Sequence, residues 1–233
     1  MKKTITLAVN DGTTMNAYVS MPEGTGPFPA VMVFQEAWGV NSHIRDVTDR
    51  IAAEGYLAVA PQLFHRTGGA DFELPYGDFS LVMPHFQAMT TEGIISDCTA
   101  TYEWLTQQED VVKQKIGAIG FCLGGRVSFI ANSALPLAAG ISYYGGSTHL
   151  VAGCAATISG PHLFFWGGKD THILPEHVDT VIGAMKQHDK EYISVVISYA
   201  NHAFFCNDRP AYHPQAAAES WGMTKEFLKN KLK

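Results

Sequence analysis

Short apolar runs alternate with segments of helical periodicity along most of this 233-residue chain. Continuous apolar runs at residues 30–34 and 56–60 are typical of strands that are buried on both faces. Between these two runs, residues 41–54 carry apolar side chains at helical spacing and stop at Gly55, a residue type that suits a helix C-terminus. The alternation predicts an α/β fold with a mostly parallel central sheet and helices on both faces.

The other expected elements follow an N-terminal antiparallel hairpin. Two alternating segments, residues 3–9 and 15–21, flank an Asp-Gly step that favours a tight turn. Further helices are expected at residues 91–108, 126–133, 175–187 and 215–232, and further strands at 115–120, 138–144, 162–166 and 192–199. Residues 65–90 show no clear periodicity and form a candidate lid. With 46% apolar content, a single domain over residues 1–233 is expected.

The hexapeptide Gly120-Phe121-Cys122-Leu123-Gly124-Gly125 stands between a β-like run and a helix-compatible run. In the G-x-S-x-G nucleophile elbow, small flanking residues let the chain turn sharply and raise the nucleophile above the sheet. A cysteine at a helix start also lies at the positive end of the helix dipole, which favours its thiolate form. The pattern predicts acyl transfer through a thioester at Cys122, although a glycine-flanked cysteine can also be a small buried residue.

Three further polar residues stand at predicted strand ends, where ligands bind in open α/β sheets. Asp170 and His202 follow two successive strands, and Glu36 follows the strand at residues 30–34. The order Cys122, Asp170, His202 is the nucleophile, acid, histidine order of α/β-hydrolases. Alternatives are that Asp170 caps the helix at 175–187 and that Glu36 is an exposed loop carboxylate. Most of the other histidines are expected at the solvated surface.

This arrangement assigns a role to each group. His202 is expected to take the proton of Cys122 and later to activate water, while Asp170 holds the imidazole of His202 in the required tautomer. The backbone N–H groups of Leu123, directly after the nucleophile, and of Ala37, after the first buried strand, are expected to form an oxyanion hole.

These motifs together resemble the dienelactone hydrolase (carboxymethylenebutenolidase) family of the α/β-hydrolase superfamily. The resemblance covers nearly the whole chain and rests on motifs at residues 34–39, 120–125, 143–145 and 166–170 and at His202. It implies hydrolysis of an enol-lactone by a monomer through an acyl-thioester, without cofactor or metal. It also implies that Glu36 keeps the Cys122 thiol protonated until substrate binds. Trp38, Tyr144 and Phe204 are expected to contact the substrate.

One departure from the family concerns the substrate carboxylate, which dienelactone enzymes bind with arginines. This chain has no arginine between Arg66 and Arg126, and lysine does not replace the bidentate grip of arginine. Arg209 and Arg66 are therefore the candidate anchors. Aromatic residues fill the candidate lid instead, namely Phe72, Tyr76, Phe79 and Phe86. They favour a substrate less acidic than dienelactone, although ordinary lid packing explains each of them equally well.

Composition excludes other classes of protein. A net charge of −6 without basic runs argues against nucleic-acid binding, and no segment approaches the roughly 20 apolar residues of a membrane span. A cytoplasmic protein with a small-molecule ligand is expected. The four cysteines lie far apart, without metal or disulfide spacing. Two alternatives to a hydrolase remain: a redox or thiol-sensing protein that pairs Cys122 with Cys206, and a catalytically silent scaffold that binds a small ligand.

Overall fold

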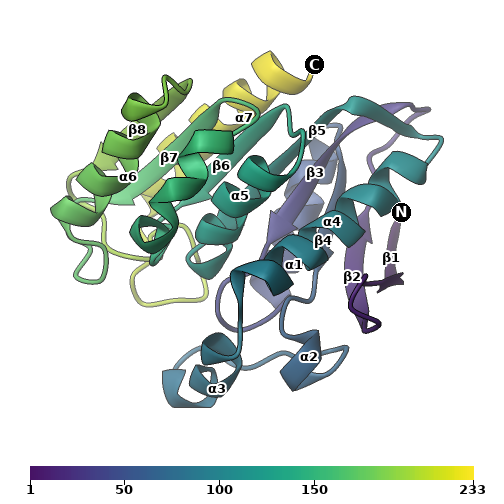
Figure 1. The fold of residues 1–233 in the computed structure, drawn as a ribbon, viewed down its shortest axis with the longest axis horizontal. Coiled ribbons are helices and arrows are strands. Elements are labelled where there is room, and N and C mark those ends of the chain that lie inside the picture. The colour runs from purple at the N-terminus through teal and green to yellow at the C-terminus, as the bar shows by residue number, and fades with distance from the viewer. The chain divides into compact units, whose positions relative to one another are not determined.

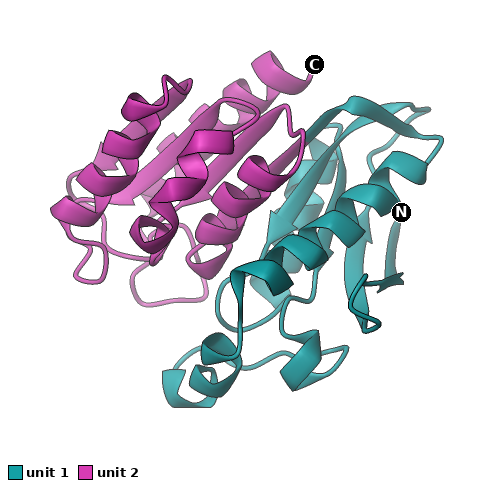
Figure 2. Cartoon of the chain, viewed as in Figure 1, with its two compact units in different colours: residues 1–116 teal, residues 117–233 magenta.

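The computed structural model describes residues 1–233 and divides into two compact units, Met1–Ile116 and Gly117–Lys233 (Figure 2). The boundary lies inside strand β5 (Val111–Phe121). Each unit contains strands that are covered by helices (Figure 1). The single domain expected from the sequence stays a prediction. No helix has both the length and the apolar character that crossing a membrane requires.

The first unit contains the predicted hairpin and the first parallel strands. Its strands are β1 (Lys2–Ala8), β2 (Thr14–Ser20), β3 (Phe28–Phe34) and β4 (Leu57–Pro61), in the spatial order β1-β2-β4-β3. β1 pairs with β2 and β2 with β4 in antiparallel fashion, whereas β3 and β4 are parallel. Gly12 closes the hairpin turn with φ 85°, a left-handed conformation that glycine adopts without steric cost. The antiparallel start predicted from the sequence is confirmed.

Two long helices cover the strands of the first unit. Helix α1 (Ser42–Ala53) begins where the Asn41 side chain accepts a hydrogen bond from the N–H of Ile44, and it packs on β2, β3 and β4. Helix α4 (Thr91–Gln107) begins at the Thr90 cap and packs on β1, β3 and β4. Figure 1 shows α4 on the near face of these strands.

The second unit is a parallel sheet. Its strands are β5, β6 (Ala139–Tyr143), β7 (His162–Gly167) and β8 (Tyr192–Ile197), which lie in chain order and pair in parallel. Its long helices are α5 (Leu123–Ala134), α6 (Pro175–Gln187) and α7 (Pro214–Leu232), with α5 in front of the sheet and α7 behind it (Figure 1). Since the strands are parallel, the residues that follow them meet at one edge of the sheet.

Four short helices were not predicted. Three lie in the candidate lid, residues 65–90: α2 (His65–Gly68), η1 (Phe79–Leu81) and α3 (Met83–Gln87). The fourth, η2 (Thr148–Thr157), follows β6. Elements this short leave little periodic signal in a sequence, and η2 has a kink at Val151 that interrupts the regular spacing.

Candidate active site

The turn from β5 to α5 has the strained geometry that the hexapeptide predicts. Cys122 adopts φ 54° and ψ −112°, a conformation that is costly for a residue with a Cβ atom. A Cβ atom at Gly120 would lie 1.9 Å from the carbonyl oxygen of Gly124, so only glycine fits there. The N–H of Cys122 donates to the Tyr143 carbonyl at 3.0 Å, which ties the turn to the end of β6. The expected sequence of strand, sharp turn and helix around Cys122 is confirmed.

Asp170 and His202 meet at the ends of β7 and β8. The Nδ1–H of His202 donates to Oδ2 of Asp170 at 2.7 Å, and the other oxygen of Asp170 accepts the backbone N–H groups of His172 and Ile173 at 2.8 and 3.0 Å. Burial alone would raise the pKa of Asp170, but these hydrogen bonds and the charge of His202 lower it. Asp170 therefore caps a tight turn and holds His202 at once, whereas the cap residue of α6 is Leu174.

The imidazole of His202 also interacts with Cys122. Burial alone would lower the pKa of His202, but the charge of Cys122, hydrogen bonds to Asp170 and Cys122, and the charge of Asp170 together raise it to about 10. Because Nδ1 is bonded to Asp170, Nε2 is the ring nitrogen that remains for Cys122. The second unit thus brings together the three residues that the sequence singles out in this order.

Aromatic rings enclose the histidine. Tyr144 and Phe204 are fully buried, and the Tyr144 ring centroid lies 5.1 Å from that of His202 and 5.3 Å from that of Phe204. The exposed ring of His172 lies edge-on to His202 at 5.5 Å. Arg209 is partly exposed in the turn that follows, where its backbone N–H donates to the Cys206 carbonyl at 3.1 Å.

The first unit contains the other predicted site residues. Glu36, Ala37 and Trp38 lie in the loop after β3, with one residue between the strand and Glu36, and all three are buried. The alternative in which Glu36 is an exposed loop carboxylate is therefore wrong. The Trp38 ring lies 4.9 Å from that of Tyr76 and 6.0 Å from that of Phe79, so these lid aromatics pack against the loop after β3. The roles of Glu36 and Ala37 toward Cys122 stay predictions.

The structure shows functional candidates that the sequence reading missed. Arg126 lies one helical turn after Cys122 on α5, and burial lowers its pKa while the charge of Cys122 opposes that shift. Its spacing from the nucleophile was a signal that could have identified it. Most histidines other than His202 are expected at the surface, but three of them, His43, His65 and His162, are buried. A residue type does not reveal burial, because burial depends on contacts between distant segments.

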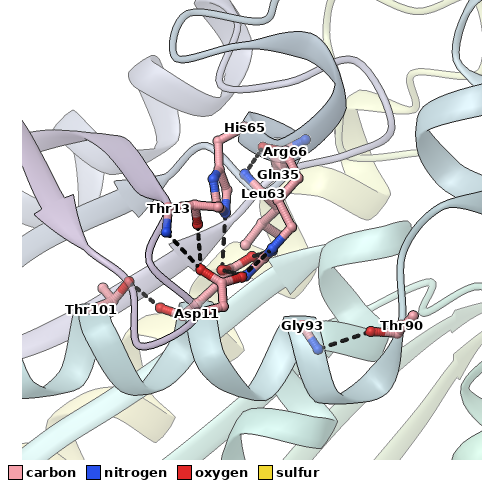
Figure 3. Close-up of polar contacts among 10 residues, drawn as sticks. Asp11, Thr13, Gln35, Leu63, His65, Arg66, Thr90, Gly93 and Thr101 are labelled. Atoms are coloured by element: carbon pink, nitrogen blue, oxygen red, sulfur yellow. Dashed lines mark hydrogen bonds and ion pairs between the residues drawn. The ribbon is translucent and has the colours of Figure 1, made fainter.

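Arg66 also differs from its expected role as a substrate anchor. Its guanidinium bonds both oxygens of Asp97 on α4 at 2.8 and 3.0 Å, and its Nε donates to Asp11 in the hairpin turn at 2.7 Å. The Nε2 atom of His65 adds a contact of 3.1 Å to Asp97. Figure 3 shows Arg66 beside Asp11 and His65 at this junction. The guanidinium therefore holds the start of the lid to α4 and to the hairpin turn.

The comparisons with known proteins agree on one family. The model of the dienelactone hydrolase family matches residues 15–232. A protein of Synechocystis sp. named "Putative carboxymethylenebutenolidase" is 32% identical over 100% of this chain and 98% of its own length. One of the same name from Yersinia pestis is 33% identical over 91% of this chain and 82% of its own length.

Solved structures show the same fold. The crystal structure of a "Putative Dienelactone Hydrolase" from Klebsiella pneumoniae has a TM-score of 0.87 and 28% identity, with 98% of this chain and 99% of that chain covered. A dienelactone hydrolase-like promiscuous phosphotriesterase from metagenomic libraries has a TM-score of 0.86 at 24% identity, with 100% and 99% covered. The fold is that of the α/β-hydrolases, as the alternation of strands and helices predicts.

Proposed function

Since the chain belongs to the dienelactone hydrolase family, a family of lactone and ester hydrolases, we propose that it cleaves such a bond with Cys122 as its nucleophile. The observation that supports this most is the double engagement of His202, which bonds Asp170 at 2.7 Å through one ring nitrogen and interacts with Cys122. A histidine oriented by a carboxylate and paired with a thiol is the arrangement of nucleophilic acyl transfer. No cofactor or metal enters the proposal.

The proposed reaction uses the proton on Nε2 of His202. With its pKa raised to about 10, the ring of His202 is protonated at neutral pH. When substrate arrives and the Cys122 thiol gives its proton to Glu36, as proposed below, the thiolate that forms lies beside this positive charge. The thiolate attacks the carbonyl carbon of the substrate, and the C–O bond to the leaving oxygen breaks as that oxygen takes the proton from Nε2 of His202. A thioester remains on Cys122. Water then gives a proton to Nε2 and attacks the thioester, and the C–S bond breaks to release the acid and restore the thiolate.

Backbone donors would stabilise the negative oxygen of each tetrahedral intermediate. Leu123 is the first residue of α5, and first-turn N–H groups have no acceptor within their own helix. Together with the N–H of Ala37 it forms the proposed oxyanion hole. The loss of one such donor typically lowers turnover about 100- to 1,000-fold.

Glu36 is proposed to regulate the thiol. Its carboxyl is completely buried after β3, an environment in which a charge is costly unless it is paired. A nearby carboxylate disfavours ionisation of a thiol, so Glu36 would keep Cys122 protonated at rest and accept its proton when substrate arrives. Glu36→Gln is expected to change both kcat and the pH dependence of Cys122 alkylation by iodoacetamide. The role is excluded if both stay as in the wild type.

The substrate is proposed to be a lactone or a small ester. Arg209 stays a candidate for binding a carboxylate, whereas the guanidinium of Arg66 bonds Asp11 and Asp97. The aromatic lid favours a less acidic compound than dienelactone. The expected monomeric state and cytoplasmic location stay predictions.

The first test is steady-state hydrolysis of dienelactone beside a neutral short-chain aryl ester. Cys122→Ala should abolish activity on both, and mass spectrometry of the quenched wild type should find an acyl group on Cys122. A preference for dienelactone would support Arg209 as the anchor, and a preference for the neutral ester would support the aromatic lid. Activity that survives in Cys122→Ala would contradict the cysteine mechanism.

The redox and silent-scaffold alternatives predict a different result, namely no Cys122-dependent hydrolysis of either compound. Neither Cys122 nor Cys206 forms a disulfide in the structure, and Cys206 is completely buried. For the redox alternative, Cys206→Ser should remove a disulfide that forms under mild oxidation, which peptide mapping would detect.

A further inference from the structure

A chain of hydrogen bonds runs beneath the elbow through three buried side chains, Asn132 of α5, His162 of β7 and Ser142 of β6. None of the three is more than 1% exposed. The Nδ2 atom of Asn132 donates to the Gly160 carbonyl at 2.9 Å and lies 3.1 Å from Nδ1 of His162. The hydroxyl of Ser142 lies 2.8 Å from Nε2 of His162 and donates to the Gly125 carbonyl at 2.6 Å. The hydrolytic steps use none of these groups.

The protons that join Asn132, His162 and Ser142 can be assigned in one way only. Ser142 has a single hydroxyl proton, which it gives to Gly125, so its oxygen must accept from Nε2–H of His162. Nδ1 of His162 is then an acceptor and takes a proton from the amide of Asn132. Burial lowers the pKa of His162 to about 3, which keeps the ring neutral and preserves this tautomer at neutral pH.

The chain of hydrogen bonds ends at the turn that carries the proposed nucleophile, Cys122. Gly125 is the third residue of α5, and its N–H donates to the carbonyl of Cys122 at 3.0 Å. A Cβ atom at Gly125 would lie 2.7 Å from Cα of Gly145, so the turn is pressed against the end of β6. The hydrogen bond from Ser142 to Gly125 therefore acts on the same turn that orients Cys122 and the N–H of Leu123.

We propose that Ser142, with His162 and Asn132 behind it, is a positioning residue that sets the orientation of Cys122 and of the Leu123 N–H by holding the carbonyl of Gly125. This inference rests on the proposed function, because it places Ser142 beneath the proposed nucleophile. A fully satisfied buried network restricts its members to one geometry, and a catalytic group tolerates misplacement of only about 0.5 Å. Apolar side chains could fill the same space without fixing the rotation of the turn.

The test compares Ser142→Ala with a matched control on α7, Thr224→Val, which removes a hydrogen bond to the next residue of β6, Tyr143. The hydroxyl of Tyr143 lies 2.7 Å from that of Thr224 on α7, so Thr224→Val also removes one buried hydrogen bond, but on a helix other than that of the elbow. With the aryl ester, Ser142→Ala is expected to lower kcat about 10- to 100-fold, with KM within about twofold of wild type. Thr224→Val should retain the wild-type kcat at a similar loss of thermal stability.

A graded variant keeps the test decisive if Ser142→Ala does not fold. Ser142→Cys has nearly the same shape but a weaker donor, so kcat should fall in the order Ser, Cys, Ala. Equal kcat in wild type and both Ser142 variants, or a fall in kcat that Thr224→Val shares, would overturn the positioning role. Failure of the proposed function is a separate result, because wild type and Cys122→Ala would then hydrolyse the ester equally.

Discussion

At the scale of single residues, His202 links the candidate site to the stability of the protein. Its folded pKa of about 10 lies above the value of 6.5 expected in the unfolded chain. A group of this kind contributes stability that is fully present below pH 6.5 and is lost as the pH rises toward 10. The free energy of unfolding should therefore decline between about pH 7 and 10.

The variant His202→Gln should flatten this decline, since it removes the proton that the folded state holds. Urea unfolding at a series of pH values measures how the free energy of unfolding declines in each protein. His188→Gln is the matched control, because His188 is exposed at the end of α6 and is not one of the candidate site residues. Parallel profiles for wild type and His202→Gln would show that the interactions with Asp170 and Cys122 do not raise the pKa of His202.

At the scale of elements, the Arg66 junction joins α2, α4 and the hairpin turn within the first unit. Asp97 is 1% exposed and Arg66 is 30% exposed. Loss of one partner from a buried ion pair costs about 3–5 kcal/mol, and the partial exposure of Arg66 places Arg66→Met at the lower end of that range. Urea unfolding should show the loss, and hydrogen exchange should show faster opening of residues 65–90.

A double variant separates charge from packing at this junction. Arg66→Met combined with Asp97→Leu replaces the pair by apolar groups but removes the contact of Asp97 with the buried His65, so it should recover only part of the lost stability. Lys229→Met removes an exposed ion pair with Glu226 and should change the free energy of unfolding by less than about 1 kcal/mol. If Arg66→Met costs no more than Lys229→Met, the junction does not hold the lid.

At the scale of the whole molecule, the monomer expected from the family can be tested by its mass. Sedimentation equilibrium should give 25.4 kDa across a range of protein concentrations. The outermost strand of the second unit, β8, exposes Ile193 and Val196, and unpaired strand edges are where sheets of two copies pair. A concentration-dependent dimer would contradict the prediction, and Val196→Lys would then test whether β8 forms the interface.

The sequence alone determined the order of the strands and long helices and the positions of Cys122, Asp170 and His202. Apolar runs, helical spacing and glycine turns act over a few residues, so each can be read locally. The hexapeptide selected Cys122, and the strand-end rule then selected Asp170, His202 and Glu36, because parallel strands end at one edge of a sheet. The contact of His202 with both partners agrees with that selection.

The tertiary structure alone decided which polar groups are buried and what they bond. His162 lies 30 residues after its partner Asn132 and 20 residues after its partner Ser142, and no local pattern links the three. Arg66 reaches Asp11 and Asp97 across separations of 55 and 31 residues. Hydrogen-bond partners of this kind are chosen when distant segments pack together, because a buried polar group must find an acceptor or donor wherever the fold supplies one.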